Sequence, residues 1–406
     1  MDDVRTTMAS ISALLSALCE KIRGLAAPGT DMELRRVSMA CILIAMHNLR
    51  STRRTMKTRK SMTPISALQF VDDEGRRRRL GGGLRACVTK VRHRTTGKTF
   101  AMKTLYPLPH QGLDDAAIYN LRVLREASFM AACRGHPSFV CLHGVCMKPN
   151  TDQQYCLLME QAGPSLYEAT LYRRLHGTAF REHQVRRMMR QVLSWAKAMH
   201  DLGIVHRNIV AENVLVGFSS FTVKIGGFGQ ATCTSETDVP CNVAVRDEAP
   251  ELLLRGRGAS ESELLDSWSI GCLMGKLLTN RTLFEIEAND RDNTARAQLC
   301  RIFNVLGVPG KRAMQEMKAR NFELAKQVRE WRARRSSVGK TNNYRLRQLV
   351  PPEVLSDDGF KVLRGLLMCN PKKRLTAGAA LQLPWFADND KSPAAGISQQ
   401  VSGPVS

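Results

Sequence analysis

The residues of this chain whose types and spacing could hold an anion are three adjacent glycines and a lysine. Gly81, Gly82 and Gly83 lack side chains, so their backbone amides could approach a bound anion closely. Lys103 stands fifteen residues after Val88 and could place an ammonium group beside the same anion. Each feature also has a plainer interpretation, since adjacent glycines are often only a flexible turn and a strand lysine is often exposed.

A second group of residues carries amides or no side chain where acid–base chemistry would need carboxylates. His206-Arg207-Asn208 is followed by Asn213, and Lys224-Ile225-Gly226-Gly227-Phe228-Gly229 lies further along the chain. An amide is neutral near pH 7, so Asn208 can orient a partner by hydrogen bonds but is not a useful base. Gly227 offers no functional group. These positions favour hydrogen bonding over proton transfer.

Together these segments resemble the motifs of the protein kinases. Residues 80–88 are similar to their glycine-rich loop, residues 100–103 to the strand with the phosphate-binding lysine, and residues 155–163 to the hinge between lobes. Without the flanking motifs, the apolar run in residues 155–159 would indicate only a buried strand. Residues 200–215 are close to the catalytic loop of the cyclin-dependent kinases, in the CMGC branch. The chain resembles the divergent plant members of class F in that branch.

The resemblance implies a binding site for ATP and assigns its residues. Lys103 would contact the α and β phosphates and pair with Glu126, Asn208 stands at the position of the catalytic base, and Asn213 would ligate a magnesium ion. Backbone groups of Glu160 and Ala162 would hydrogen-bond the adenine. The residues expected around the nucleotide are Leu80, Gly81, Gly83, Val88, Ala101, Lys103, Glu160, Ala162, Asn213 and Leu215, with Met159 behind them.

The same resemblance identifies what the chain has lost. In the family an Asp at the position of Asn208 accepts the substrate's proton, and an Asp at the position of Gly227 holds magnesium ions. Val210 replaces a lysine that would neutralise the transferred phosphate. General-base assistance contributes about 10²–10⁴ in rate, and an oriented charge-stabilising group about 2.7–4 kcal/mol, although such losses do not add. The sequence therefore predicts inefficient phosphoryl transfer and argues against Mg²⁺ as a cofactor.

The residues that would hold a kinase framework are present. Glu251, in Ala249-Pro250-Glu251, matches the end of the activation segment, and Arg374 is its expected buried partner. Asp266 is expected to brace the backbone of the catalytic loop. Residues 302–309 and 350–352 resemble the insert of the cyclin-dependent branch. The residues expected to stack as an apolar spine between the lobes are Met130, His206 and Phe228.

Positioning these motifs requires a small sheet and a larger helical part. Residues 69–386 read as strands with one helix and then a long helical portion, which predicts an α+β, bilobal protein kinase fold. Its N-lobe would be small and β-rich and its C-lobe larger and α-helical. Residues 1–60 predict a helical hairpin, packed on itself or on the neighbouring lobe rather than dimerising, and a basic linker. Residues 387–406 are expected to form a disordered tail.

Some positions depart from the cyclin-dependent pattern. Residues 120–126 occupy the position of the helix that meets a cyclin in this branch, but their sequence differs from that of the branch, which argues against cyclin binding. Residues 246–248 lack the aromatic pair and arginine that help build the peptide-binding site, so we expect altered substrate docking. Thr237 lies near the usual activating phosphosite, where Arg125 and Arg207 could hold a phosphate.

Charge and composition bound the partners and the compartment. The chain has 406 residues and a formal net charge of +23, which favours acidic partners. Basic runs at residues 50–60 and 76–79 are typical of nuclear import or of solvated linkers, so nucleus and cytoplasm stay open. The 12 cysteines form no zinc motif and predict reduced thiols. The apolar stretch at residues 37–46 is too short to cross a bilayer, so we expect no membrane span.

Three functions follow from these observations. The leading one is a pseudokinase that binds ATP and acts as a scaffold or regulator, with an acidic or phosphorylated protein as partner. The second is a serine/threonine protein kinase with weak activity, in which Asn208 only orients the substrate hydroxyl. The third is nucleic-acid binding by the basic extension. Basic residues at 311–335 have Trp331 alone among them, which disfavours base stacking.

Overall fold

The computed structural model describes residues 68–106, 115–147, 154–217, 222–234, 248–255, 262–284, 295–316 and 344–387. Short gaps fall at 71, 74–75, 78, 84–85 and 135, and residues 326 and 330 are described singly. The hairpin and linker expected at residues 1–60, the phosphosite candidate Thr237 and the tail beyond Ala387 lie outside the described residues.

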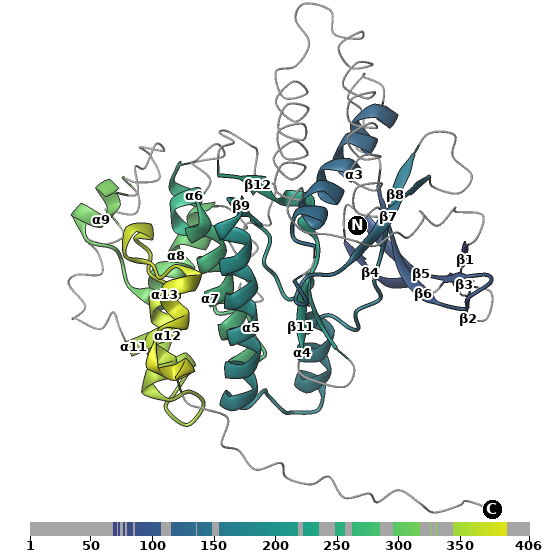
Figure 1. Ribbon diagram of the computed structural model, residues 1–406. Helices are drawn as coiled ribbons and strands as arrows, with labels where there is room; N and C mark the ends of the chain where they lie inside the picture. Colours follow the sequence, from purple (N-terminus) through teal and green to yellow (C-terminus); the bar gives the residue numbers. More distant parts are fainter. Residues whose placement is uncertain are drawn as a thin grey trace, which may run out of the picture.

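The first part of the fold is an antiparallel sheet packed against one helix (Figure 1). Its strands run in the order β1-β5-β6-β8-β7, and β4 pairs with β5 on the edge away from β6, alongside the part of β5 that β1 leaves open. The elements are β1 (Leu68–Phe70), β4 (Arg79–Gly83), β5 (Ala86–His93), β6 (Thr99–Leu105), α3 (Asp115–Ala132), β7 (Leu142–Met147) and β8 (Tyr155–Met159). A separate pair, β2 (Asp72–Asp73) with β3 (Arg76–Arg77), places part of the basic run at residues 76–79 in a strand rather than a linker.

Both faces of the sheet are buried, because successive side chains along its strands point alternately to two hydrophobic clusters. Phe100, Met102 and Leu158 point to a small cluster on one face. Ala101 and Met159 point to the other face and join the main core of the molecule. Val88 of β5, which pairs with Lys103, lies on this face and packs against the same core, since cross-strand neighbours share a face.

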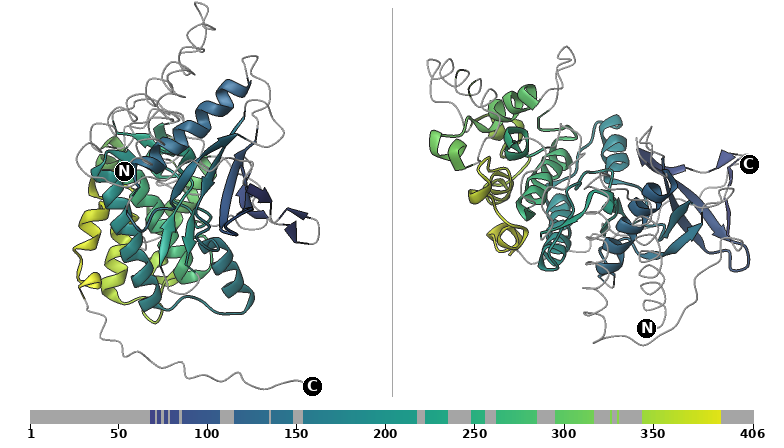
Figure 2. Two further views of the ribbon diagram at one scale, coloured as in Figure 1. Left: turned by 45° about the vertical axis from the view of Figure 1, so that its right-hand side comes forward. Right: turned by 90° about the horizontal axis from the view of Figure 1, so that it is seen from above.

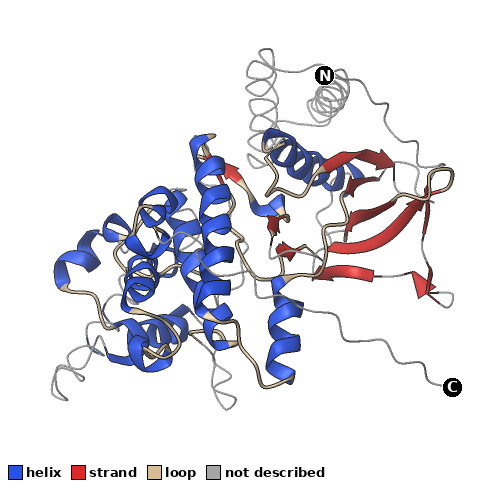
Figure 3. Ribbon diagram, turned by 60° about the horizontal axis from the view of Figure 1, so that its bottom comes forward, coloured by secondary structure: helices blue, strands red, loops and turns tan. Residues whose placement is uncertain are grey.

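The second part is mostly helical, and it lies beside the sheet (Figures 2 and 3). Its helices are α4 (Leu166–Leu175), α5 (Glu182–Asp201), α6 (Pro250–Arg255), α7 (Glu263–Thr279), α8 (Ala295–Leu306), α9 (Lys311–Glu316), α11 (Tyr344–Leu349), α12 (Asp357–Leu366) and α13 (Ala377–Leu381). Among the residues that the structure describes, short 3₁₀ turns are η3 (Phe228–Gln230), η5 (Pro371–Lys373) and η6 (Pro384–Phe386). Short antiparallel pairs join β9 (Ile204–Val205) to β12 (Thr232–Cys233) and β10 (Val214–Val216) to β11 (Val223–Ile225).

The two long helices of this part differ in pattern because they differ in burial. On α5, Val185, Met189 and Val192 recur at helical spacing and are buried, while the other face is polar. On α7, apolar residues run all round and nearly the whole helix is buried, as in the centre of a larger domain. A small sheet part and a larger helical part confirm the predicted α+β, two-lobed fold.

Two further findings concern the described helices and cysteines. None of the helices that the structure describes is long and apolar enough to cross a membrane. The described cysteines are free thiols, and burial raises the pKa of Cys133 to about 12 and that of Cys146 to about 11. These two thiols are therefore protonated and unreactive at neutral pH.

Candidate functional site

The register of the sheet brings the predicted nucleotide-binding residues together on one face. Gly81 pairs with Val88, and Val88 pairs with Lys103 on the next strand. Ala101, two residues before Lys103, pairs with Met159 and so faces the same side. Glycine is required at Gly82, where φ is +147° and a Cβ would lie 2.6 Å from the carbonyl of Ala86. Gly83 pairs with Ala86 at the end of the same hairpin.

Lys103 and Glu126 form the pair predicted from the sequence. The lysine Nζ lies 2.6 Å from Oε1 and 2.8 Å from Oε2 of Glu126, which holds α3 against β6. The glutamate is only 1% exposed and the lysine 14%, so the carboxylate depends on this ammonium for its charge balance. Gly229 lets the next segment come close, since a Cβ there would lie 3.3 Å from Glu126 Oε2.

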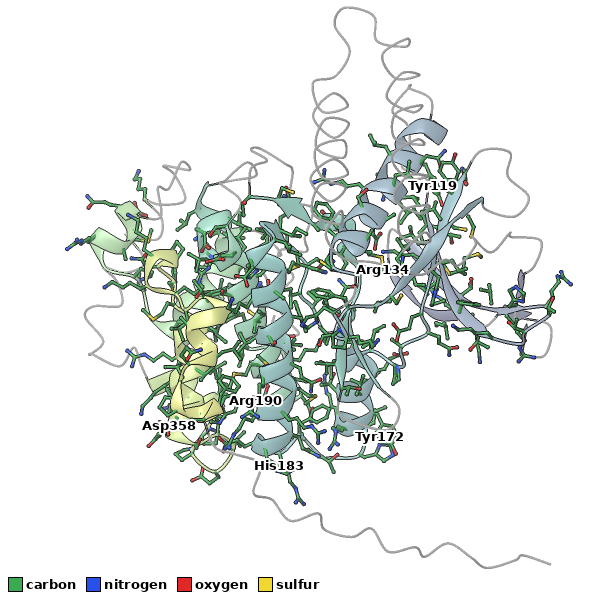
Figure 4. All side chains as sticks on the ribbon, viewed as in Figure 1. Tyr119, Arg134, Tyr172, His183, Arg190 and Asp358 are labelled. Atoms are coloured by element: carbon green, nitrogen blue, oxygen red, sulfur yellow. The ribbon has the colours of Figure 1, made fainter. Side chains whose placement is uncertain are left out.

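The helix α3 is also fastened to the sheet at its other end (Figure 4). Its Tyr119 hydroxyl accepts a hydrogen bond from the amide of Leu105 at 3.1 Å. The side-chain oxygen of Asn120 accepts one from the amide of Tyr155 at 2.8 Å. The orientation of Glu126 is therefore set by its pair with Lys103 and by these contacts near the start of the helix.

Glu160 and Ala162 follow β8, where the chain passes from the sheet to the helical part. The Glu160 carboxylate pairs with Lys224 of β11 at 2.6 Å and accepts a hydrogen bond from the amide of Cys141 at 3.0 Å. The sequence did not suggest this ion pair, because residues 160 and 224 are distant in the chain. Four other predicted pocket residues, Leu80, Val88, Ala162 and Leu215, are half-buried and pack against the main core.

Asp266 holds the loop that carries Asn208, as predicted. Its carboxylate accepts hydrogen bonds from the amides of His206 at 2.8 Å and Arg207 at 2.7 Å. The same carboxylate lies 2.9 Å from Nε2 of His200. Arg207 has a φ of 63°, in the left-handed region that residues other than glycine rarely adopt. A fully buried carboxylate therefore stabilises a strained turn beside Asn208.

His206 is a neutral structural ring in this loop. The amide of Asn208 donates to its Nδ1 at 3.3 Å, so Nε2 carries the proton and donates to the carbonyl of Gly226 at 3.1 Å. Burial lowers the pKa of His206, although the nearby Asp266 carboxylate opposes the shift. Its ring packs edge-on against Phe228 at 4.8 Å between centroids, and Met130 is buried in the same core.

Asn208 and Asn213 are joined within the loop. The Nδ2 amide of Asn213 donates to the carbonyl of Asn208 at 2.9 Å, and its backbone amide donates to the carbonyl of Val210 at 2.9 Å. The backbone carbonyl of Asn213 in turn accepts from the amide of Gly226 at 2.9 Å. The site thus keeps its backbone geometry with neutral side chains.

The side chain of Asn213 packs directly against Gly227. A Cβ placed on Gly227 would lie 2.6 Å from Cγ and 2.9 Å from Nδ2 of Asn213, and would overlap its Oδ1 as well. Gly227 also has a φ of +79°, which disfavours any other residue. The space that a longer side chain would need is therefore filled by the asparagine.

These residues do not fit a magnesium ion. Mg²⁺ is held in proteins by one or two carboxylates in octahedral geometry together with water and phosphate oxygens. Asn213 supplies one amide oxygen, Gly227 supplies none, and no group of three or more His, Cys, Asp or Glu side chains that could hold a metal occurs among the described residues. At this position the side chains of Asn213 and Gly227 thus offer one amide oxygen and no carboxylate.

The closing motif and its arginine form a buried bidentate pair. Arg374 Nη1 and Nη2 lie 2.7 Å and 2.8 Å from the two carboxylate oxygens of Glu251. The guanidinium also donates to the carbonyls of Leu264 and Met368. This confirms the predicted partner of Glu251 and ties α6 to the turn before α13.

Comparison with known proteins agrees with this geometry. The family model described as protein kinase domain matches residues 75–386. The chain belongs to the protein kinase family. A protein of Oryza sativa subsp. japonica named "Putative cyclin-dependent kinase F-2" is 36% identical over 327 residues, covering 78% of this chain and 90% of that protein.

Two further relatives are more distant kinases. "Cell division control protein 2 homolog 2" of Trypanosoma brucei brucei is 30% identical over 333 residues, covering 80% of this chain and 85% of that protein. "Mitogen-activated protein kinase spk1" of Schizosaccharomyces pombe is 28% identical over 316 residues, covering 76% of each chain. The predicted resemblance to the cyclin-dependent branch of the kinases is confirmed.

Proposed function

We propose that this cyclin-dependent-kinase-like chain is catalytically impaired, binds ATP, and acts through binding as a scaffold or regulator. One observation carries the proposal: at Gly227 the carboxylate is missing and its space is occupied by Asn213. Asn208 adds to this, because its amide cannot accept the proton of an attacking hydroxyl. Lys103, the face of the sheet that carries Val88, Ala101 and Met159 beside Gly81, and the backbone at Glu160 and Ala162 would hold the nucleotide.

The arrangement of α3 supports a kinase-like framework that needs no cyclin for assembly. The Lys103–Glu126 pair is formed within the chain, and Tyr119 and Asn120 hold the same helix to the sheet. We therefore propose an acidic or phosphorylated protein as the partner rather than a cyclin. The formal charge of +23 favours such a partner.

Thermal denaturation with ATP tests the proposal. ATP at about 100 times its dissociation constant should stabilise the protein by about 2.7 kcal/mol, and to the same extent in magnesium and in EDTA. The double variant Lys103→Met/Glu126→Gln, which removes both charges of the pair, should lose the shift. Lys98→Ala, at an exposed lysine just before the same strand, should keep it. A shift that appears only with magnesium would contradict the loss of the metal site.

The intact framework and the kinase names of the relatives favour a weakly active serine/threonine kinase as the second candidate. Activity in the wild type that disappears in Lys103→Met/Glu126→Gln would support this candidate. Activity that appears only in Asn208→Asp/Gly227→Asp would support impairment. Because Gly227→Asp must displace Asn213, this variant needs a check of folding before its activity is interpreted.

A further inference from the structure

The helix α4 exposes its larger apolar stripe to solvent. Its inner face is formed by Leu166 and Thr170, which are buried. Tyr167, Leu171, Tyr172 and Leu175 are 41%, 41%, 64% and 76% exposed. Four of the seven large hydrophobic residues that are exposed in the described part of the chain thus lie on one ten-residue helix. Scattered exposed apolar residues are ordinary, but a cluster of this kind marks an interaction surface.

The exposed residues form a continuous surface rather than scattered points. Tyr167, Leu171 and Leu175 stand four residues apart and therefore line one side of the helix. Tyr172 lies beside Leu175, and its ring packs on His176 with 4.1 Å between centroids. Figure 4 shows Tyr172 at the end of α4 that points away from the sheet, near His183 at the start of α5. We call this surface the α4 stripe.

The helix itself is well anchored, so the stripe is not a frayed end. Ser165 and Glu168 form a reciprocal capping box at its start, with bonds of 3.2 Å and 2.7 Å. The Thr170 hydroxyl donates to the carbonyl of Leu166 at 2.7 Å on the inner face. The side chain of Asn280 donates to the carbonyl of Thr178 and fixes the loop after the helix.

The charge around the α4 stripe differs between its two ends. Near Tyr167, the Lys276 ammonium lies 4.9 Å from the ring centroid and 4.0 Å from the carboxylate of Glu212, so the charge there is balanced. At the other end the side chains are basic, and the only carboxylate of the helix, Glu168, stays at its start. The residues that make this end basic are Arg173, Arg174, Arg181 and, next to Asn280, Arg281.

We propose that the α4 stripe docks an acidic segment of a partner protein, with apolar side chains seated on Leu171 and Leu175 and carboxylates facing Arg174 and Arg181. An apolar centre with a charged rim is the usual anatomy of a protein interface. The one-sided basic rim selects acidic sequences and fixes their direction along the helix. The proposal does not depend on nucleotide binding or on catalytic activity, because no residue of the stripe belongs to the candidate site.

A designed peptide tests the proposal with the full-length protein. The probe is a fluorescein-labelled helical peptide of about 16 residues with leucine at i, i+4 and i+8 and glutamate elsewhere on that side. Its fluorescence anisotropy should rise on titration with the wild type. The double variant Leu171→Glu/Leu175→Glu should bind at least about tenfold more weakly, and Arg174→Glu should weaken binding most at low salt.

Matched controls separate docking from general effects. Leu202→Glu/Leu349→Glu changes two other leucines, 47% and 46% exposed, at the far end of α5 and on α11, and should bind like the wild type. The same peptide with lysine in place of glutamate should not bind. Melting temperatures of all variants should agree, because the substituted side chains are exposed.

Three results would overturn the proposal. One is that the wild type fails to bind the acidic peptide at millimolar concentration. Another is that the lysine peptide binds the wild type as tightly as the glutamate peptide does, or that the Leu171→Glu/Leu175→Glu variant binds the glutamate peptide as tightly as the wild type does. The third is a wild-type dimer in sedimentation that this same variant converts to a monomer, which would make the stripe an interface between copies of this chain.

Discussion

The side chain of Asn213 occupies the volume that a Cβ on Gly227 would need, with its Cγ only 2.6 Å from that position. The asparagine is held there by its hydrogen bond to the carbonyl of Asn208. The absence of a side chain at Gly227 and the position of the Asn213 side chain therefore depend on each other. In the structure, this position is therefore occupied by a hydrogen-bonded neutral side chain.

This relationship predicts how Gly227→Ala behaves. A left-handed φ costs an alanine about 1–2 kcal/mol, and displacement of Asn213 adds to that loss. We expect Gly227→Ala to lower the melting temperature by several degrees, and by less in an Asn213→Ala background. Gly97→Ala is the matched control, since its φ is +67° and no atom lies within 4 Å of the added Cβ. Equal losses at Gly227 in both backgrounds would contradict the steric account.

The Lys103–Glu126 pair predicts coupled effects on stability. Lys103→Met leaves a buried carboxylate without its cation, whereas Lys103→Met/Glu126→Gln leaves no charge. Breaking a buried pair on one side typically costs about 3–5 kcal/mol, an upper bound here because the lysine is partly exposed. Urea denaturation should therefore show the single variant to be less stable than the double variant. The reverse order would mean that the glutamate is solvated.

The Glu251–Arg374 pair should matter far more than an exposed pair of similar length. Glu251→Ala leaves the Arg374 guanidinium buried and should lower the free energy of unfolding by about 3–5 kcal/mol. The comparison is Asp201→Ala, which removes a 2.6 Å contact with Lys197 on the surface of α5 and should change stability by less than about 1 kcal/mol. Chemical denaturation of both variants measures the difference, and similar values would show that burial is not the cause.

Burial of His206 predicts that acid destabilises the fold. Because its folded pKa is lowered, the unfolded chain binds more protons at pH values below about 6.5, the ordinary pKa of histidine. Stability therefore falls as the pH is lowered through that value. Lowering the pH from about 7.5 to about 5.5 crosses the ordinary pKa of histidine and should therefore lower the melting temperature. This decrease should be smaller in His206→Tyr. If the melting temperature of that variant depends on pH as strongly as that of the wild type, the loss of stability in acid is due to other groups.

The sequence allowed the framework to be predicted because its contacts belong to motifs with set spacing. Lys103 with Glu126, Glu251 with Arg374, and Asp266 with the amides of His206 and Arg207 were all expected and are all present. Each of these contacts joins groups whose positions the family pattern determines.

Other features depended on packing that no motif records. The contact of Asn213 with Gly227 depends on where one side chain packs, and the pairing of Glu160 with Lys224 joins the residue after β8 to β11. On α4, periodicity alone would bury the stripe of Tyr167, Leu171 and Leu175. The structure instead buries Leu166 and Thr170, because the capping box and the neighbouring strand β10 orient the helix.

Radiolabel transfer from γ-labelled ATP to a basic protein substrate tests the central claim most directly. The account predicts that the wild type transfers no more label than Lys103→Met/Glu126→Gln. Thermal denaturation curves should first show that both proteins are folded. Transfer at a rate on the order of 1 s⁻¹, which is ordinary for a kinase, and its loss in that variant would contradict the account.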